Sequence, residues 1–361
     1  MIRVGVVGAS GWAAGSHLPA LAALPEFEVT AVATTKQASA GKAAAGHNVP
    51  HAFTDANTLA AHPSVDLVVV SVKAPEHSKV IRAALKAGKH VLSEWPLTAD
   101  PDEAPDLAEA ATAAGVLHAV SLQGTHSPDA RFVADLINGG RIGRLESAVL
   151  VASGAPYGGG SIYPDLAWCA DPAGGATILT IMAGHFIATL ERMTGSLAEV
   201  SARLPRLYDQ LTLEGTSRTI PNQTPSHVLV HGTLENGATA SITVHGASGS
   251  PDGFLVKLVG SEGTIVITPP QPGTYMHWTD WDIRVNNEPT KVPDAYVTVP
   301  FDPSAGPVAN VAAVYQEFAR ALTENRQPTP NFHTAARLHH LLTTIEEAAR
   351  TGNPEEVRPR R

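Results

Sequence analysis

The sequence of 361 residues predicts an α/β protein in which a doubly wound parallel sheet is followed by an α+β domain with an open, mostly antiparallel sheet. Three observations support this fold class. β-branched runs alternate with Ala-rich helical runs over about the first 120 residues, as in repeated βα units. The first unit has a turn of small residues between strand and helix. From Gly143 onward, β-type runs are separated by turn signals. We expect one domain over residues 1–122 and a second over residues 123–361.

The first βα unit has the composition of a dinucleotide-binding turn. Residues 2–7 form a β-branched run that predicts a buried strand, and residues 17–24 predict a helix. Small residues between them let the backbone approach a pyrophosphate at the helix N-terminus. The fingerprint is imperfect because a serine replaces the usual middle glycine, and an ordinary tight strand–helix turn would fit the same residues. The candidate cofactor-binding residues here are Gly8, Ser10, Gly11 and Trp12.

The alternation continues through the rest of the first domain. Strands are predicted at residues 28–33, 65–72, 90–93 and 117–121, and helices at residues 37–45, 78–87 and 101–114. In such sheets, ligands bind outside the carboxyl ends of the strands. The residues that follow each strand are therefore the candidates for a site.

The end of the second strand predicts the cofactor. NAD enzymes usually carry Asp or Glu there, which holds the ribose 2′-hydroxyl. This sequence has Thr34 and Lys36 instead, so no carboxylate repels a 2′-phosphate, while a hydroxyl and an ammonium group can bind one. We expect NADP at this site, with NAD possible. The alternative is that Lys36 is a solvated residue at a helix start.

The strand at residues 65–72 leads into a second group of candidates. Ser71, Val72 and His77 should border the nicotinamide half of the cofactor, because they follow the strand's carboxyl end. Lys73 is a candidate proton donor in the same place. The alternatives are that Lys73 is a surface residue at the start of a loop and that His77 is part of the scaffold.

Residues 88–97, Gly-Lys-His-Val-Leu-Ser-Glu-Trp-Pro-Leu, resemble the signature region of the glucose–fructose oxidoreductase and inositol dehydrogenase family, Gfo/Idh/MocA. The resemblance extends to residues 174–176, 184–185 and 330–337, so it spans nearly the whole chain. It implies an N-terminal Rossmann domain, nicotinamide-dependent chemistry on a sugar or polyol, and at least a dimer formed through the second domain's sheet.

One branch of this family is more similar still. The residues Gly11-Trp12-Ala13, Glu94-Trp95-Pro96-Leu97 and Ser121-Leu122-Gln123-Gly124 resemble the fungal galactose-regulon repressor and its bacterial relatives. The resemblance implies dinucleotide binding without the usual catalytic lysine, in a protein that acts as a transcriptional sensor. It adds Glu94, Trp95 and Gln123 to the candidate cofactor-binding residues.

The sequence departs from the family pattern at the groups that handle protons. Trp95 stands where the family has lysine, and Ile181 stands where it tends to have aspartate. Only His185 matches, in an apolar helix predicted at residues 177–193, where the alternative is an ordinary core histidine. Lys73 and Tyr163 are candidate assistants. Trp95 could form a flat apolar wall, and a cis bond before Pro96 would be plausible.

The second half predicts the remaining elements. Strands are expected at residues 145–152, 228–234, 239–245, 254–260 and 263–267, and helices at residues 310–325 and 334–350. Asn236-Gly237 is typical of a hairpin turn, because both residues accept a positive φ.

Several classes of function are disfavoured. The net charge of −9 argues against a nucleic-acid surface. No apolar run reaches the ~20 residues of a membrane helix, and the first residues already read as a strand, not a signal peptide, so we expect a cytoplasmic protein. The histidines near residues 333–340 lack a metal-binding pattern, so no metal is expected. No tyrosine is followed four residues later by lysine, which excludes a short-chain dehydrogenase site.

Two functions remain. The first is an NADP-dependent oxidoreductase that acts on a sugar, a polyol or a related hydroxylated small molecule, in a homo-oligomer (a dimer or tetramer). The second is a non-catalytic NADP-binding sensor or regulatory protein. The sequence does not identify the substrate.

Overall fold

The computed structural model describes residues 1–154, 156–246, 253–298 and 306–357, which divide into two compact units. The first unit contains Met1–Gln123 together with residues 306–336. The second contains Gly124–Thr298 and the residues from Arg337 onward. Residues 306–336, which were expected in the second domain, belong to the first compact unit.

The first unit is built on a six-stranded sheet in which every neighbouring pair is parallel. This confirms the predicted parallel sheet. The strand order is β3-β2-β1-β4-β5-β6. The strands after β1 are added first on one side of it, as β2 and β3, and then on the other side, from β4 onward, so the order reverses between β1 and β4. Ligands of such sheets bind at the carboxyl ends near this reversal. The strands are β1 Ile2–Val7, β2 Phe27–Ala33, β3 His51–Phe53, β4 Leu67–Val70, β5 His90–Glu94 and β6 His118–Ser121.

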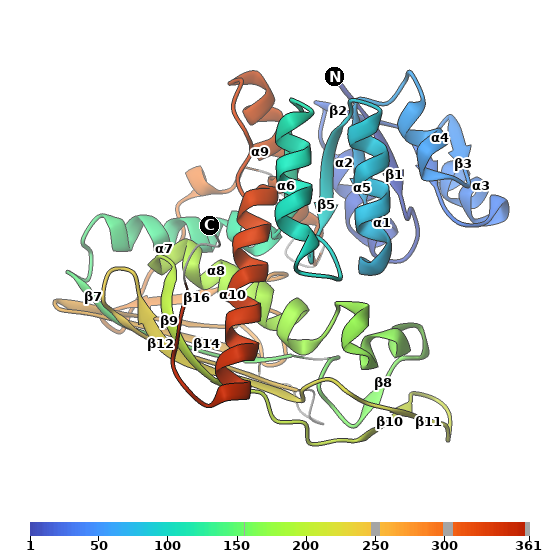
Figure 1. Ribbon diagram of the computed structural model, residues 1–361. Coiled ribbons are helices and arrows are strands. Elements are labelled where there is room, and N and C mark those ends of the chain that lie inside the picture. The colour runs from blue at the N-terminus through green and yellow to red at the C-terminus, as the bar shows by residue number, and fades with distance from the viewer. Residues whose placement is uncertain (155, 247–252, 299–305, 358–361) are drawn as a thin grey trace. The chain divides into compact units, whose positions relative to one another are not determined.

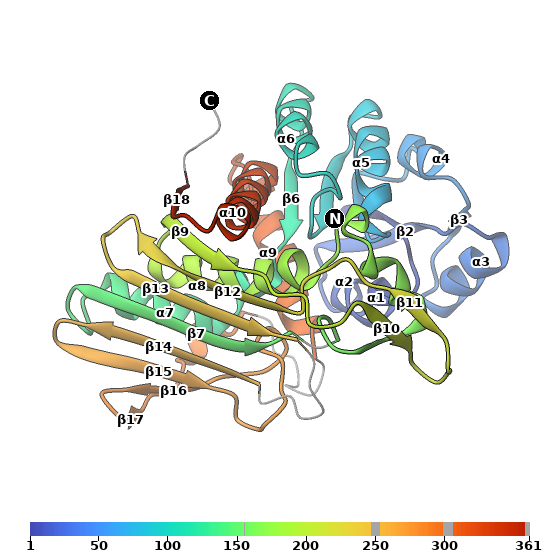
Figure 2. The same cartoon turned by 60° about the horizontal axis from the view of Figure 1, so that its bottom comes forward.

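Helices cover both faces of this sheet (Figure 2). One face carries α4, α5 and α6, and the other carries α1, α2 and α9. The short elements α1, β3 and α4 were not predicted, because a few residues show no periodicity. The helices of this unit are α1 Trp12–Gly15, α2 His17–Ala22, α3 Gln37–Gly46, α4 Ala56–Ala61, α5 His77–Lys86, α6 Glu103–Ala113 and α9 Val308–Thr323, with a 3-10 turn η1 at Ala74–Glu76.

Helix α9 belongs to the first unit because of its apolar face. Val311, Tyr315 and Phe318 recur at intervals of three and four residues, which places them on one side of the helix. All three are fully buried in the same core cluster as Leu18 of α2. The Tyr315 ring also packs edge-on against the Phe27 ring, with centroids 5.3 Å apart.

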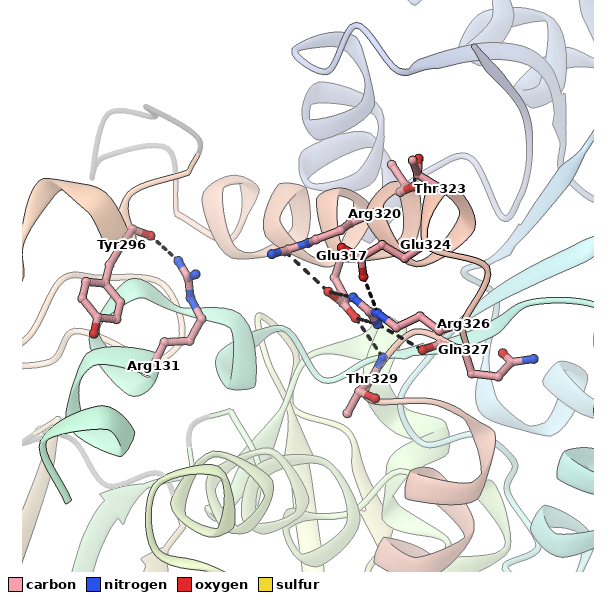
Figure 3. A network of polar contacts seen from close by, with 10 residues as sticks. Arg131, Tyr296, Glu317, Arg320, Thr323, Glu324, Arg326, Gln327 and Thr329 are labelled. Carbon is pink, nitrogen blue, oxygen red and sulfur yellow. Dashed lines mark hydrogen bonds and ion pairs between the residues drawn. The ribbon is translucent and has the colours of Figure 1, made fainter. Parts of the chain in front are cut away.

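A polar network fixes the turn that follows α9 (Figure 3). Arg326 forms ion pairs with Glu317 and Glu324, at 2.6 Å in each case. The Thr329 amide donates to the same Glu317 carboxylate at 3.3 Å. The pairs are partly exposed, so they contribute little net stability. Their effect is to order the turn that leads to Pro330, whose carbonyl accepts from the Val120 amide in β6.

The second unit is built on a nine-stranded sheet with the order β17-β16-β15-β14-β7-β13-β12-β9-β18. Its neighbouring pairs are antiparallel except β7–β13, which is parallel, so the predicted mostly antiparallel sheet is confirmed. The strands are β7 Leu145–Ser153, β9 Leu197–Arg203, β12 His227–Leu234, β13 Thr239–His245, β14 Phe254–Gly260, β15 Gly263–Thr268, β16 Asp282–Val285, β17 Glu288–Pro289 and β18 Glu355–Glu356. A separate small sheet joins β8 Ser161–Ile162, β10 Gln210–Leu213 and β11 Thr219–Pro221.

The helices α7, Pro128–Asn138, and α8, Gly184–Thr194, lie on one face of the nine-stranded sheet (Figures 1 and 2). The single helix expected at residues 177–193 is instead a π-helical turn, η5 at Ile178–Ala183, followed by α8. Thr177 and Thr180 cap the start reciprocally through their hydroxyls. π-helical turns often occur at functional sites. The remaining elements are the 3-10 turns η2 Gln123–His126, η3 Pro164–Ala170, η4 Pro172–Gly174 and η6 Asp294–Tyr296, and the helix α10 Phe332–Thr351.

The 3-10 turn η6 is tied to α7 by a group of contacts (Figure 3). Arg131 donates to the carbonyl of Tyr296 and lies over its ring, 5.8 Å from the centroid. The Tyr296 hydroxyl donates to Asp135 at 2.7 Å. These contacts attach the segment that follows the sheet to the helix layer of the same unit.

A buried carboxyl group makes the stability of the second unit depend on pH. Asp129 is 4% exposed, and burial raises its pKa to about 7, although the Trp281 amide donates to it at 3.0 Å. Asp280 adds a repelling charge. The native state keeps this proton to a higher pH than the unfolded state does. The free energy of unfolding should therefore decrease as the pH rises from about 4 to about 7.

Replacement of Asp129 with Asn should remove this dependence, since the amide oxygen still accepts from Trp281 and carries no charge. We compare the unfolding free energy of D129N with that of the wild type, both measured in urea. The difference should grow by roughly 2–4 kcal/mol in favour of D129N from pH 4 to pH 8. An unchanged difference would contradict the assignment of the titration to Asp129.

Candidate functional site

Gly8 occupies a position at the end of β1 that only glycine fits. Its φ is +90°, and a Cβ there would lie 2.1 Å from the carbonyl oxygen of Ser71. The amides of Gly8 and Ala9 both face the carbonyl of Ala33 at the end of β2. The ends of β1, β2 and β4 therefore meet closely, which leaves backbone and not side chains at this edge of the sheet.

The turn after Gly8 exposes its backbone. Ser10 and Gly11 are exposed, and Gly11 has a φ of +54° at the start of α1. Trp12 is partly buried and packs against the core of the first unit. Residues 8–12 thus have the small-residue geometry that a pyrophosphate needs at a dinucleotide-binding turn.

Three buried polar atoms next to the carboxyl ends of β4 and β6 make no hydrogen bond within the described residues. They are Ser71 Oγ after β4, Ser121 Oγ at the end of β6, and Gln123 Oε1 just beyond it. Such atoms are rare in native proteins, and each calls for an explanation. Their position after the carboxyl ends of two strands fits a polar ligand such as a carboxamide or ribose. Ser121 was not among the predicted residues, and its place at a strand end was the available signal.

His77 holds two loops of the first unit together. It is 2% exposed, and its Nδ1 and Nε2 lie 2.8 Å and 3.0 Å from the carbonyl oxygens of Pro96 and Val72. Burial lowers the pKa of His77, and the hydrogen bonds to the two carbonyl oxygens oppose this effect. With both nitrogens facing backbone, the imidazole joins the loop after β4 to the loop after β5.

The residues at the end of β5 have distinct surroundings. The Glu94 carboxylate lies 2.9 Å from Nε2 of His17, the first residue of α2. Trp95 is 4% exposed, and the bond between Trp95 and Pro96 is cis. Lys73, beyond β4, is exposed where η1 begins.

Hydroxyl groups gather at the end of β2. Thr34 Oγ1 lies 2.6 Å from Ser39 Oγ and donates to the carbonyl of Lys36 at 3.0 Å. Ser39 donates to the same carbonyl at 2.9 Å. Lys36 itself is exposed at the start of α3. The sequence gives no signal for Ser39, which lies in the first turn of α3 and not at the strand end.

In the second unit, His185 lies beside a second histidine. His185 is 7% exposed in α8, and the ring of the fully buried His277 lies 5.6 Å from its own. His277 Nε2 lies 3.0 Å from the hydroxyl of Thr189, one turn farther along α8. Burial, and second the nearby His185, hold the pKa of His277 well below its usual value. A Cβ at Gly124 would come within 2.0 Å of the His277 ring, so only glycine fits there.

Aromatic residues surround this histidine pair. Phe186 and Tyr275 have ring centroids 5.2 Å and 4.8 Å from that of His277. Burial raises the pKa of Tyr275 and of Tyr157 far above the usual value, so both hydroxyls keep their protons. His277 is therefore packed against aromatic rings that carry no charge. His277 was not predicted, because it lies in the irregular segment between β15 and β16.

The sequence also singles out Tyr163 and Ile181 in the second unit. Tyr163 is 53% exposed before η3, and its hydroxyl makes no hydrogen bond within the described residues. Ile181 lies in η5 and packs against the small apolar cluster that contains Cys169. The structure thus places His185 beside His277, and Ile181 stands where the family tends to have aspartate.

Among the residues that the structure describes, no group of three or more His, Cys, Asp or Glu side chains could hold a metal ion. Within the same residues, no helix is both long enough and apolar enough to cross a membrane.

Two family models match the chain in succession. Residues 2–122 match the oxidoreductase family with an NAD-binding Rossmann fold, Gfo/Idh/MocA. Residues 128–269 match the C-terminal domain of Gal80p. The two matches meet at the boundary between the two compact units.

Individual relatives include both enzymes and a regulator. The dehydrogenase aclE of Aspergillus oryzae is 27% identical over 74% of this chain and 77% of its own. The galactose/lactose metabolism regulatory protein GAL80 of Saccharomyces cerevisiae is 29% identical over 65% of this chain and 58% of its own. Among solved structures, levoglucosan dehydrogenase in complex with NADH and levoglucosan has a TM-score of 0.85 and 19% identity, covering 99% of this chain and 100% of that one, which shows a shared fold.

Proposed function

The chain carries a Gfo/Idh/MocA Rossmann domain followed by a Gal80-like C-terminal domain, and from this premise we propose that it is an NADP-dependent oxidoreductase acting on a sugar, a polyol or a related hydroxylated small molecule. The observation that best supports cofactor binding is the set of unpartnered polar atoms of Ser71, Ser121 and Gln123. A dinucleotide at the carboxyl edge of the sheet would satisfy them. Because Gly8 has no side chain and lies close to Ser71, the dinucleotide could contact the backbone at this edge of the sheet.

Nicotinamide, when bound, supplies the hydride acceptor or donor. The protein must then position the substrate carbon and move the proton of its hydroxyl group. His185 is the proposed acid–base group, because it is the one match to the family's proton-handling residues and its imidazole suits exchange near neutral pH. Lys73 and Tyr163 stay as proposed assistants, and their exposure leaves both side chains accessible.

The cofactor-binding residues are proposed on the same basis. Ser10, Gly11 and Trp12 would contact the pyrophosphate, and Val72, Glu94 and Trp95 would border the nicotinamide ribose. His77 is better explained as a brace between the two loops, since both ring nitrogens face carbonyl oxygens. This revises its proposed role from direct contact to support.

The NADP preference depends on the end of β2. Thr34, Ser39 and Lys36 bring two hydroxyls and an ammonium group to the start of α3, without a carboxylate on any of the three. T34D would place a negative charge where the 2′-phosphate is proposed to bind. We expect the Kd for NADPH to rise about 10- to 100-fold, the equivalent of one charge-assisted hydrogen bond. The Kd for NADH should stay the same or fall, because a carboxylate at this position can hold the ribose 2′-hydroxyl.

Fluorescence titration with NADPH and NADH measures both constants. T219D serves as the control, because it adds the same charge to an exposed position in β11 of the second unit. An unchanged ratio of the two constants in T34D would exclude Thr34 from the phosphate site.

A second function is favoured by a specific observation. The Gal80-like domain occurs together with Trp95 and Ile181 at the two positions where the family has lysine and aspartate, so a non-catalytic NADP-binding sensor is the alternative. General acid–base groups contribute about 10²- to 10⁴-fold in rate, so the loss of two of them would be costly for an enzyme. Cofactor binding without turnover would favour the sensor.

Association of copies of the chain is proposed to use the nine-stranded sheet. Val151, Leu229 and Leu255 lie on one cross-strand row, since Thr243 pairs with both Val151 and Leu229, and Leu255 pairs with Val151. The two leucines are 39% and 38% exposed. Apolar side chains on an exposed sheet face are typical of a subunit interface. We propose a homo-oligomer on this basis.

A further inference from the structure

A buried chain of hydrogen bonds links α9 to the end of β5 in the first unit. Tyr315 OH lies 2.7 Å from Nδ1 of His17, and Nε2 of the same ring lies 2.9 Å from Oε1 of Glu94. The His17 and Tyr315 side chains are fully buried, whereas the Glu94 side chain is 13% exposed. These hydrogen bonds thus run from the core to a carboxylate at the carboxyl edge of the sheet.

The chemistry of the three groups fixes the positions of the protons. A carboxylate accepts only, so the His17 nitrogen that faces Glu94 must donate. In the neutral form of an imidazole the other nitrogen accepts, so Nδ1 would accept from the Tyr315 hydroxyl. Burial, and second the charge of Glu94, raise the pKa of Tyr315 well above its usual value, so the hydroxyl keeps the proton that it donates. Tyr315 therefore holds His17 in the tautomer that binds Glu94.

Packing alone does not require these polar groups. The cluster around Tyr315 is apolar, with Leu18, Leu21 and Phe318 among its members. A phenylalanine and an aliphatic side chain could fill similar volumes without the cost of burying a hydroxyl and an imidazole. The arrangement gains a carboxylate of fixed orientation at the place where a ligand of the sheet would bind.

We propose that His17 and Tyr315 are positioning residues, which set the Glu94 carboxylate for the nicotinamide ribose although neither is exposed at the sheet edge. The inference rests on the proposed cofactor function. It predicts that cofactor affinity depends on the hydroxyl group of Tyr315 in α9. This residue lies 298 positions after His17 in the sequence.

The test is a double-mutant cycle with NADPH as the probe. Y315F removes only the hydroxyl, and we expect the Kd to rise about 3- to 10-fold, which corresponds to one hydrogen bond. E94Q should raise it by at least as much. The double variant should bind no more weakly than E94Q alone, because the hydroxyl acts only through the carboxylate.

F318L is the matched control, since it disturbs the same face of α9 without removing a hydrogen bond between Tyr315, His17 and Glu94. It should lower the unfolding free energy and leave the Kd unchanged. If Y315F also leaves the Kd unchanged, or if the effects of Y315F and E94Q simply add, the inference is wrong.

Imidazole nitrogen NMR of the protein without cofactor separates this inference from the proposed function. His17 should be the Nε2–H tautomer in the wild type and change in Y315F. A wild-type protein that fails to bind NADPH but shows this tautomer would contradict the proposed function and keep the hydrogen-bond chain. A different tautomer would contradict the chain itself.

Discussion

Replacement of His185 with Asn should lower kcat by about 10²- to 10⁴-fold, with little change in the Kd for NADPH. The magnitude is that of a general acid–base group. It should reach the upper part of this range, because the aligned positions of lysine and aspartate are occupied by Trp95 and Ile181, which cannot exchange protons. His185 is buried, and its ring lies 5.6 Å from that of His277.

The measurement is a steady-state assay at several pH values, with unfolding followed in urea to check that the variant folds. H339N is the control for loss of a buried imidazole, because His339 is 4% exposed in α10 of the same unit. Full activity in H185N would show that another group carries the proton. Similar losses in both variants would assign the effect to folding.

Replacement of Gly8 with Ala should abolish tight cofactor binding and destabilise the first unit. A non-glycine residue is strained at a φ of +90°, which costs of the order of 1–3 kcal/mol. In addition, the new Cβ would overlap the carbonyl oxygen of Ser71, which is backbone and cannot swing aside. The ends of β1 and β4 would have to separate, and the turn that is proposed to bind the pyrophosphate would move with them. We expect the Kd for NADPH to rise more than about 10-fold, the equivalent of 1.4 kcal/mol.

G41A is the matched control in the same unit. Gly41 lies in α3, with no atom within 4 Å of a Cβ built there, so alanine should be neutral or slightly stabilising in the helix. NADPH titration and urea unfolding of G8A and G41A give both quantities. Wild-type affinity in G8A would contradict the close approach of the two strand ends.

The sequence predicted the parts of the fold whose signal is local. The parallel sheet follows from short apolar strands that alternate with helices, and Gly8 follows from the need for a small residue at a dinucleotide-binding turn. A strand as short as β3, with three residues, carries no such signal. The helix predicted over residues 177–193 is present, but its first part, Ile178–Ala183, is π-helical, which apolar spacing does not reveal.

The features that could not be predicted depend on contacts between residues distant in the chain. Tyr315 reaches His17 across 298 positions, and His277 reaches Thr189 across 88. Neither Tyr315 nor His277 belongs to a motif, and the spacing of each residue within its own segment indicates only that it is buried. The same limit explains why α9 joins the first unit, since nothing in its own pattern identifies the core that it packs against.

Turnover by purified protein tests the central claim most directly. With NADPH binding first established by fluorescence, the protein is mixed with NADP and a panel of neutral sugars and polyols, and with NADPH and the corresponding carbonyl compounds, and absorbance at about 340 nm is followed. The proposed oxidoreductase predicts a change with at least one compound that is lost in H185N. Tight NADPH binding without any change across the panel would contradict the enzyme and favour the sensor.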